Sequence, residues 1–98
     1  MFILQIEHPV HSFEGWKRVF DSDPVGRKKM GVRRYRILRD ASVPNFVVIE
    51  LEFAEKHEAE ALLAALGDVW RKVEGKLIEG ARHRITEVVE TVELGDLR

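Results

Sequence analysis

The order in which two hydrophobic periodicities alternate along the chain is the strongest constraint on its fold. Apolar residues first recur at every second position up to His8-Pro9, which predicts a strand containing Phe2, Leu4 and Ile6. Apolar residues then recur three and four positions apart, which predicts a helix that Ser12 caps and that ends near Asp21. The buried face of this helix is expected to contain Phe13, Trp16, Val19 and Phe20.

The same two periods predict the rest of the chain. Turn-forming residues at 23–31 predict a loop, and Val32 to Arg39 and Phe46 to Phe53 read as two strands of a hairpin. A long helix begins near Glu55, and Arg82 to Leu94 is expected to be the fourth strand. The order β-α-β-β-α-β predicts an α+β, ferredoxin-like fold with a four-stranded antiparallel sheet and two helices on one face. At 98 residues, the chain is expected to be a single domain over residues 1–98.

A single register of this hairpin pairs opposite charges on one face of the sheet and apolar side chains on the other. If Arg36 lies opposite Glu50, then Arg34 lies opposite Glu52, and Tyr35 lies opposite Leu51 on the other face. The second face is apolar and is expected to pack under the helices. The first face is mixed, which indicates a surface that a second copy covers; its expected residues are Arg34, Arg36, Phe46, Val48, Glu50 and Glu52. The alternative is that the charges are ordinary cross-strand pairs on a solvated face.

Charge and composition exclude several classes of function. Sixteen basic residues against 17 acidic ones give a net charge of −1, so neither a nucleic-acid partner nor a membrane partner is expected. Arg27 to Lys29 form a basic run in the predicted loop. This run is interpreted as solvated, with contact to an anion over a cavity as the alternative. The first ten residues lack the pattern of a signal peptide and no apolar run reaches about 20 residues, so a cytoplasmic protein is expected.

No metal site and no cofactor are expected. The chain has no cysteine, and its four histidines are scattered along the sequence without the spacing of metal ligands. His8 and His11 flank a strand-to-helix turn, whereas His57 lies at the exposed start of the second helix.

Several segments together resemble a known family. They are the strand end at His8-Pro9, the helix with Trp16 and Phe20, the run from Asp23-Pro24 to Gly31-Val32-Arg33, and the strand from Asn45 to Phe53 leading into Glu58 to Leu63. The chain resembles the dimeric α/β-barrel superfamily, in particular its antibiotic biosynthesis monooxygenase-like, small uncharacterised bacterial branch. The resemblance implies a homodimer whose sheets face each other as an α/β barrel, with a ligand cavity between helices and sheet. Members of the superfamily include cofactor-free oxygenases, isomerases and haem enzymes, so the fold does not select a chemistry.

Four side chains are candidates for that cavity: His8, Trp16, Tyr35 and Trp70. Their rings suit stacking on a small aromatic ligand, and a histidine can take a phenolic proton near neutral pH. The alternative, which is favoured, is that both tryptophans fill the core and that Tyr35 is a buried ring.

The leading hypothesis for function is a homodimeric small-molecule-binding protein. One alternative is a cofactor-independent monooxygenase or cyclase-like enzyme that acts on an aromatic or polyketide-like substrate. Another is a regulatory protein-interaction module that uses the open sheet face to join a different protein.

Overall fold

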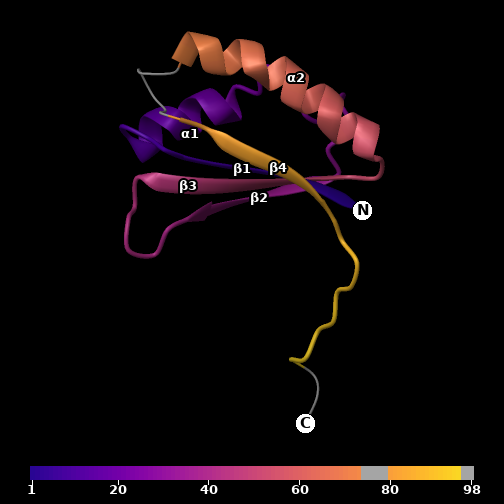
Figure 1. The fold of residues 1–98 in the computed structure, drawn as a ribbon. Coiled ribbons are helices and arrows are strands. Elements are labelled where there is room, and N and C mark those ends of the chain that lie inside the picture. Colours follow the sequence, from indigo (N-terminus) through magenta and orange to yellow (C-terminus); the bar gives the residue numbers. More distant parts are fainter. Residues whose placement is uncertain (74–79, 96–98) are drawn as a thin grey trace.

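A computed structural model describes residues 1–73 and 80–95, and it contains the predicted order of elements. The strands form one antiparallel sheet in the order β2-β3-β1-β4, and Figure 1 shows both helices on the same side of it. The predicted ferredoxin-like fold is therefore confirmed. The elements are β1 (Phe2–Pro9), α1 (Phe13–Asp21), β2 (Arg34–Arg39), β3 (Phe46–Phe53), α2 (Lys56–Val73) and β4 (Arg82–Glu87).

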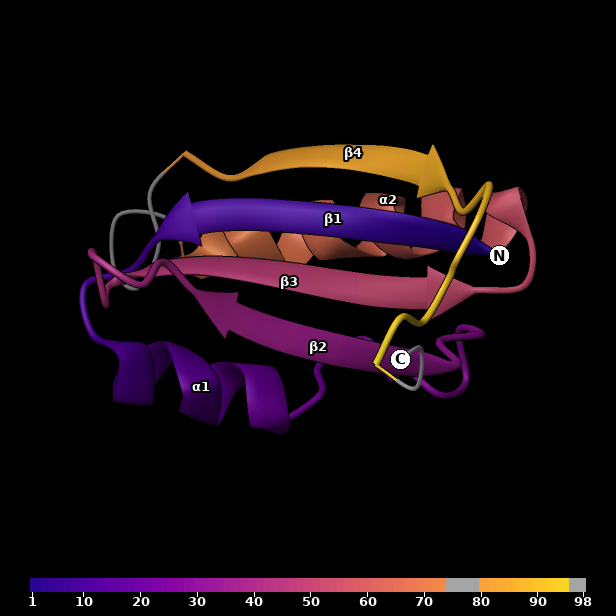
Figure 2. The same cartoon turned by 90° about the horizontal axis from the view of Figure 1, so that it is seen from below.

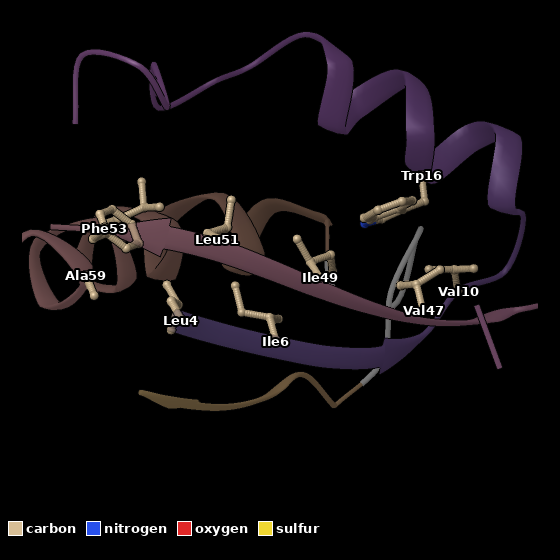
Figure 3. Packing of buried hydrophobic residues seen from close by; sticks show 10 residues of the cluster. Leu4, Ile6, Val10, Trp16, Val47, Ile49, Leu51, Phe53 and Ala59 are labelled. Atoms are coloured by element: carbon tan, nitrogen blue, oxygen red, sulfur yellow. The ribbon is translucent and has the colours of Figure 1, made fainter. Parts of the chain in front are cut away.

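The predicted hairpin register is also confirmed. Arg34 pairs with Glu52, Arg36 with Glu50 and Tyr35 with Leu51. Since side chains alternate across a strand, this register places one apolar set on the helix side of the sheet. Figure 3 shows that set packed between the sheet and the helices. Each of its strand residues is at most 3% exposed: Leu4, Ile6, Val47, Ile49, Leu51 and Phe53.

A side chain near the start of each helix accepts a hydrogen bond from a backbone N–H and so stabilises its first turn. The Ser12 side chain accepts a hydrogen bond from the Gly15 backbone N–H at 3.1 Å, and so caps the first turn of α1. At the start of α2, Glu58 accepts one from the Glu55 backbone N–H at 3.0 Å. Within residues 1–73 and 80–95, no helix is long and apolar enough to cross a membrane.

Two strand boundaries differ from the prediction. β2 begins at Arg34 and not at Val32, because the Val32 backbone N–H donates to the Arg27 carbonyl in the preceding loop. β4 ends at Glu87 and not at Leu94. Its last residue, Glu87, pairs with Phe2, the first residue of the neighbouring strand β1, so the ladder between the two strands ends there.

Residues 88–95, here called the C-terminal arm, therefore leave the sheet. The Val88 N–H donates to the Met1 carbonyl at 2.9 Å, and the arm then extends away on the side of the sheet opposite the helices (Figure 1). Three of its apolar residues lie in water in the single chain: Val89, Val92 and Leu94 are 91%, 61% and 65% exposed.

Gly31, in the loop before β2, lies against the side chain of Glu58 near the start of α2. Its φ is 101°, and a Cβ added there would lie 2.8 Å from Glu58 Cδ. We expect Gly31→Ala to lower the free energy of unfolding by about 1–3 kcal/mol, because alanine is strained at this φ and contacts the Glu58 side chain. Urea denaturation measures this loss. Gly95→Ala, which adds a Cβ into open space, is the matched control, and equal effects of both substitutions would refute the explanation.

Candidate functional site

A cavity of about 70 Å³ lies between the helix side of the sheet and the two helices. Its floor comes from β1 and β3, one wall from α1 and the loop that follows it, and the other wall from α2. The lining is almost entirely apolar or aromatic, and His8 and Arg27 are its two ionisable groups. The lining residues are Ile6, His8, Trp16, Val19, Phe20, Pro24, Val25, Arg27, Ile49, Leu51, Leu62, Leu66, Val69 and Trp70.

His8 lies at the floor of the cavity and is 2% exposed. It shares the parity of Leu4 and Ile6 in β1, which turns its ring toward the helices. Its Nδ1 lies 3.0 Å from the carbonyl oxygen of Pro9. Because a carbonyl oxygen only accepts hydrogen bonds, this contact places the proton of a neutral ring on Nδ1 and the basic lone pair on Nε2.

Trp16 forms the α1 wall and belongs to a row of aromatic rings. The ring centroid of His8 lies 6.0 Å from that of Trp16 in an edge-on arrangement, and the Trp16 ring lies 5.3 Å from Phe20. Phe20 in turn meets Tyr35 edge-on at 5.1 Å. The spacing of Trp16 and Phe20 along the helix puts both rings on the same face (Figure 3 shows Trp16 projecting from α1 toward the sheet).

The other two sequence-predicted site residues differ in position. Trp70 lines the cavity from α2 and stacks on His83 of β4 with ring centroids 6.3 Å apart. Tyr35 lies outside the lining and is 43% exposed. It was expected to be a buried ring, but β2 is an edge strand of the sheet and the helices leave Tyr35 partly uncovered. The structure therefore brings together His8, Trp16 and Trp70.

Arg27 lines the cavity although the basic run was interpreted as solvated. Lys28 and Lys29 are exposed as that interpretation requires, but the Arg27 side chain is only 14% exposed. Its Nη1 donates to the Phe20 carbonyl at 2.8 Å, and its backbone N–H donates to Asp23 Oδ1 at 2.8 Å. The left-handed backbone of Asp23, with φ of 53°, folds the loop back over α1. The Asp-Pro-Val-Gly sequence predicted a turn there but carries no periodicity to show which way Arg27 points.

The cavity is smaller than typical ligand sites, which hold about 300–1,000 Å³. As it stands, it has room for a few water-sized groups. Its floor is fixed, since Ile49 and Leu51 are buried core residues, whereas Val69 and Trp70 on the α2 wall are only half-buried. A ring-sized ligand therefore requires the α2 wall to move outward. Among the residues described, no group of three or more metal-ligating side chains comes together.

Comparison with solved structures shows that the fold recurs in several proteins. The cofactor-independent oxygenase SnoaB from Streptomyces nogalater superposes with a TM-score of 0.73 at 17% identity, over 93% of this chain and 95% of that one. A candidate antibiotic biosynthesis monooxygenase from Deinococcus radiodurans gives 0.68 at 14% identity, over 95% and 97% of the chains. A dimeric ferredoxin-like protein from an uncultured marine organism gives 0.69 at 11% identity, over 95% and 99%.

No protein-family model matches the chain, and no curated protein matches it significantly. The likeness to these structures covers most of the chain and is one of fold. It confirms the expected ferredoxin-like fold.

Proposed function

We propose that the protein is a homodimeric small-molecule-binding protein of the cytoplasm, and that its ligand occupies the cavity between the sheet and the two helices. The observation that carries this proposal is the composition of the cavity: an apolar, aromatic lining with two ionisable groups, His8 on the floor and Arg27 on a wall. Small-molecule sites have this composition, because apolar contact provides affinity and a few polar groups fix orientation. A small aromatic compound would contact the rings of Trp16 and Trp70 from opposite walls.

The chain contains its own reporter of ligand binding, since it has two tryptophans and both line the cavity. We expect benzamide, a neutral single-ring probe, to shift both indole N–H signals in the NMR spectrum of nitrogen-15-labelled protein. Val69→Phe, which fills the α2 wall, is expected to weaken this shift at least about fivefold, since the added ring takes the space of the ligand. Val43→Phe, in the exposed β2–β3 turn, is the control. If benzamide still shifts both indole signals fully in Val69→Phe, binding at this site is refuted.

The face of the sheet opposite the helices, here called the open face, supports the homodimer. Arg34 Nε donates to Glu52 at 2.6 Å and Arg36 donates to Glu50, so these four charges are already paired within one chain. Phe46 and Val48, which share the face, are half-buried. A second copy fits such a surface, because it buries the apolar residues and brings an identical set of paired arginines and glutamates.

The C-terminal arm gives independent support for the same partner. It leaves the body on the side of the open face, as Figure 2 shows from that side, and its three exposed apolar residues make no core of their own. Exposed apolar surface of this kind marks a protein interface. A second copy stacked on the open face would meet this arm, and the dimeric ferredoxin-like proteins of the same fold show that the architecture is compatible with pairing.

Because the chain lacks cysteine, a single introduced thiol tests this interface directly. We expect Val48→Cys protein to form a covalent dimer with a short bis-maleimide at micromolar concentration, since two stacked faces bring the two thiols close. Val43→Cys, on the exposed turn, is the matched control and is expected to stay monomeric on a denaturing gel. Equal cross-linking of both variants would contradict a face-to-face dimer.

His8 favours a second candidate function, a cofactor-independent monooxygenase or cyclase-like enzyme on an aromatic or polyketide-like substrate. As a general base, His8 can remove one proton from an activated methylene carbon of the substrate, and the carbanion can then reduce molecular oxygen and lose the second hydrogen. One oxygen atom stays on that carbon as a carbonyl, and the other leaves as water with the two hydrogens removed. SnoaB, described as a cofactor-independent oxygenase, has the same fold.

Oxygen uptake in metal-free buffer tests the enzymatic alternative. With anthrone as substrate, we expect the unaltered protein to consume oxygen and His8→Gln to be at least about 100-fold slower, the usual worth of a general base. Tyr35→Phe, which changes a ring outside the cavity lining, is expected to retain the rate. Absence of turnover, or equal rates in His8→Gln and the unaltered protein, would remove the enzymatic candidate and leave the binding function.

A further inference from the structure

Arg27 is a cation placed at the wall of a cavity that is otherwise apolar. A charged side chain that is only 14% exposed loses much of its hydration, so its presence there calls for interactions that compensate. Part of this compensation is internal: Nη1 donates to the Phe20 carbonyl at 2.8 Å, and the guanidinium carbon lies 3.9 Å from the Phe20 ring centroid and 4.9 Å from that of Tyr35. These contacts hold the guanidinium in a fixed position.

The internal contacts use little of the hydrogen-bonding capacity of this group. A guanidinium carries five N–H donors, and in the part of the chain that the structure describes only Nη1 makes a hydrogen bond. The nearest carboxylate is Asp23, whose Oδ1 lies 3.6 Å from Nη1 and already accepts a hydrogen bond from the Arg27 backbone. Arg27 is thus held by its contacts with the Phe20 and Tyr35 rings and by the hydrogen bond of Nη1, and most of its N–H donors are left for another acceptor.

We propose that Arg27 makes the cavity selective for aromatic ligands that carry an anionic oxygen, a carboxylate or an ionised phenol. This inference rests on the proposed binding function and specifies its ligand. The aromatic part occupies the space between Trp16 and Trp70, and the anionic oxygen accepts hydrogen bonds from the guanidinium. A planar fork of donors in a poorly hydrated position binds carboxylates strongly, since a charge-assisted hydrogen bond is stronger than a neutral one.

Asp23 opposes this role and so provides a sharp test of it. Its carboxylate lies 3.6 Å from Nη1, so it competes with a ligand anion for the guanidinium and repels that anion. Asparagine keeps the oxygen that accepts the Arg27 backbone N–H and tolerates the left-handed φ of 53°. Asp23→Asn therefore removes the competing charge while it preserves the turn.

The experiment compares benzoate with benzamide, which are planar and nearly the same size but differ in charge at neutral pH. Both are titrated into nitrogen-15-labelled protein, and the two indole N–H signals report occupancy of the cavity. We expect the unaltered protein to bind benzoate about tenfold more tightly than benzamide. Arg27→Gln should abolish this preference. Arg39→Gln, which removes a guanidinium that lies 4.7 Å from the Phe13 ring centroid and outside the cavity lining, should retain it.

Asp23→Asn should raise the affinity for benzoate about two- to fivefold and leave that for benzamide unchanged. A merely structural role of Arg27 would lower both affinities together in Arg27→Gln and would predict no gain in Asp23→Asn. The comparison in unaltered protein and in Asp23→Asn also stands if Arg27→Gln fails to fold.

The outcomes separate this inference from the function on which it rests. Binding of benzamide without any preference for benzoate would overturn the role of Arg27 and leave the binding site intact. A benzoate preference that survives Arg27→Gln would also overturn it. If neither probe shifts the indole signals of the unaltered protein, both the anion selectivity and the proposed binding function fall.

Discussion

The register between β2 and β3 is the constraint on which the other features of the molecule depend. Pairing Arg34 with Glu52 and Arg36 with Glu50 places these four charges on one face, and the other face is apolar except for Arg39 at the end of β2, which lies over the Phe13 ring. A shift by one residue would turn charged side chains toward the helices, where burial without partners is costly. The two faces therefore acquire different roles: the apolar face carries the helices and the cavity, and the charged face stays open.

The cavity follows from how two unequal helices cover that apolar face. The nine-residue α1 contributes Trp16 and the longer α2 contributes Trp70, while the loop after α1 brings Arg27 back onto Phe20. This loop is held by the positive φ of Asp23 and by its hydrogen bond to the Arg27 backbone. The cavity thus has a buried floor, a half-buried α2 wall and one cation held by its contacts with Phe20.

Sequence reasoning reached those features that periodicity determines. The order of elements, the hairpin register and the burial of Trp16 follow from the periods of the apolar residues, so the sequence alone predicts them. The parity of His8 puts it on the apolar face, but its place at a strand end left its burial open. The end of β4 depends on where β1 begins, and the exposure of Tyr35 depends on how far α1 reaches over an edge strand. The orientation of Arg27 depends on backbone angles in an aperiodic loop. These three are properties of tertiary arrangement, which a local pattern does not contain.

In the proposed dimer, a second copy of the chain covers the face of the sheet opposite the helices, and the two open sheets close into a barrel. Sedimentation equilibrium at micromolar concentration tests this dimer, because it gives a mass that is independent of shape. The expected species has twice the 11.3 kDa mass of the single chain. A mass of 11.3 kDa across that range would contradict it, since Phe46, Val48 and the C-terminal arm would then remain in water.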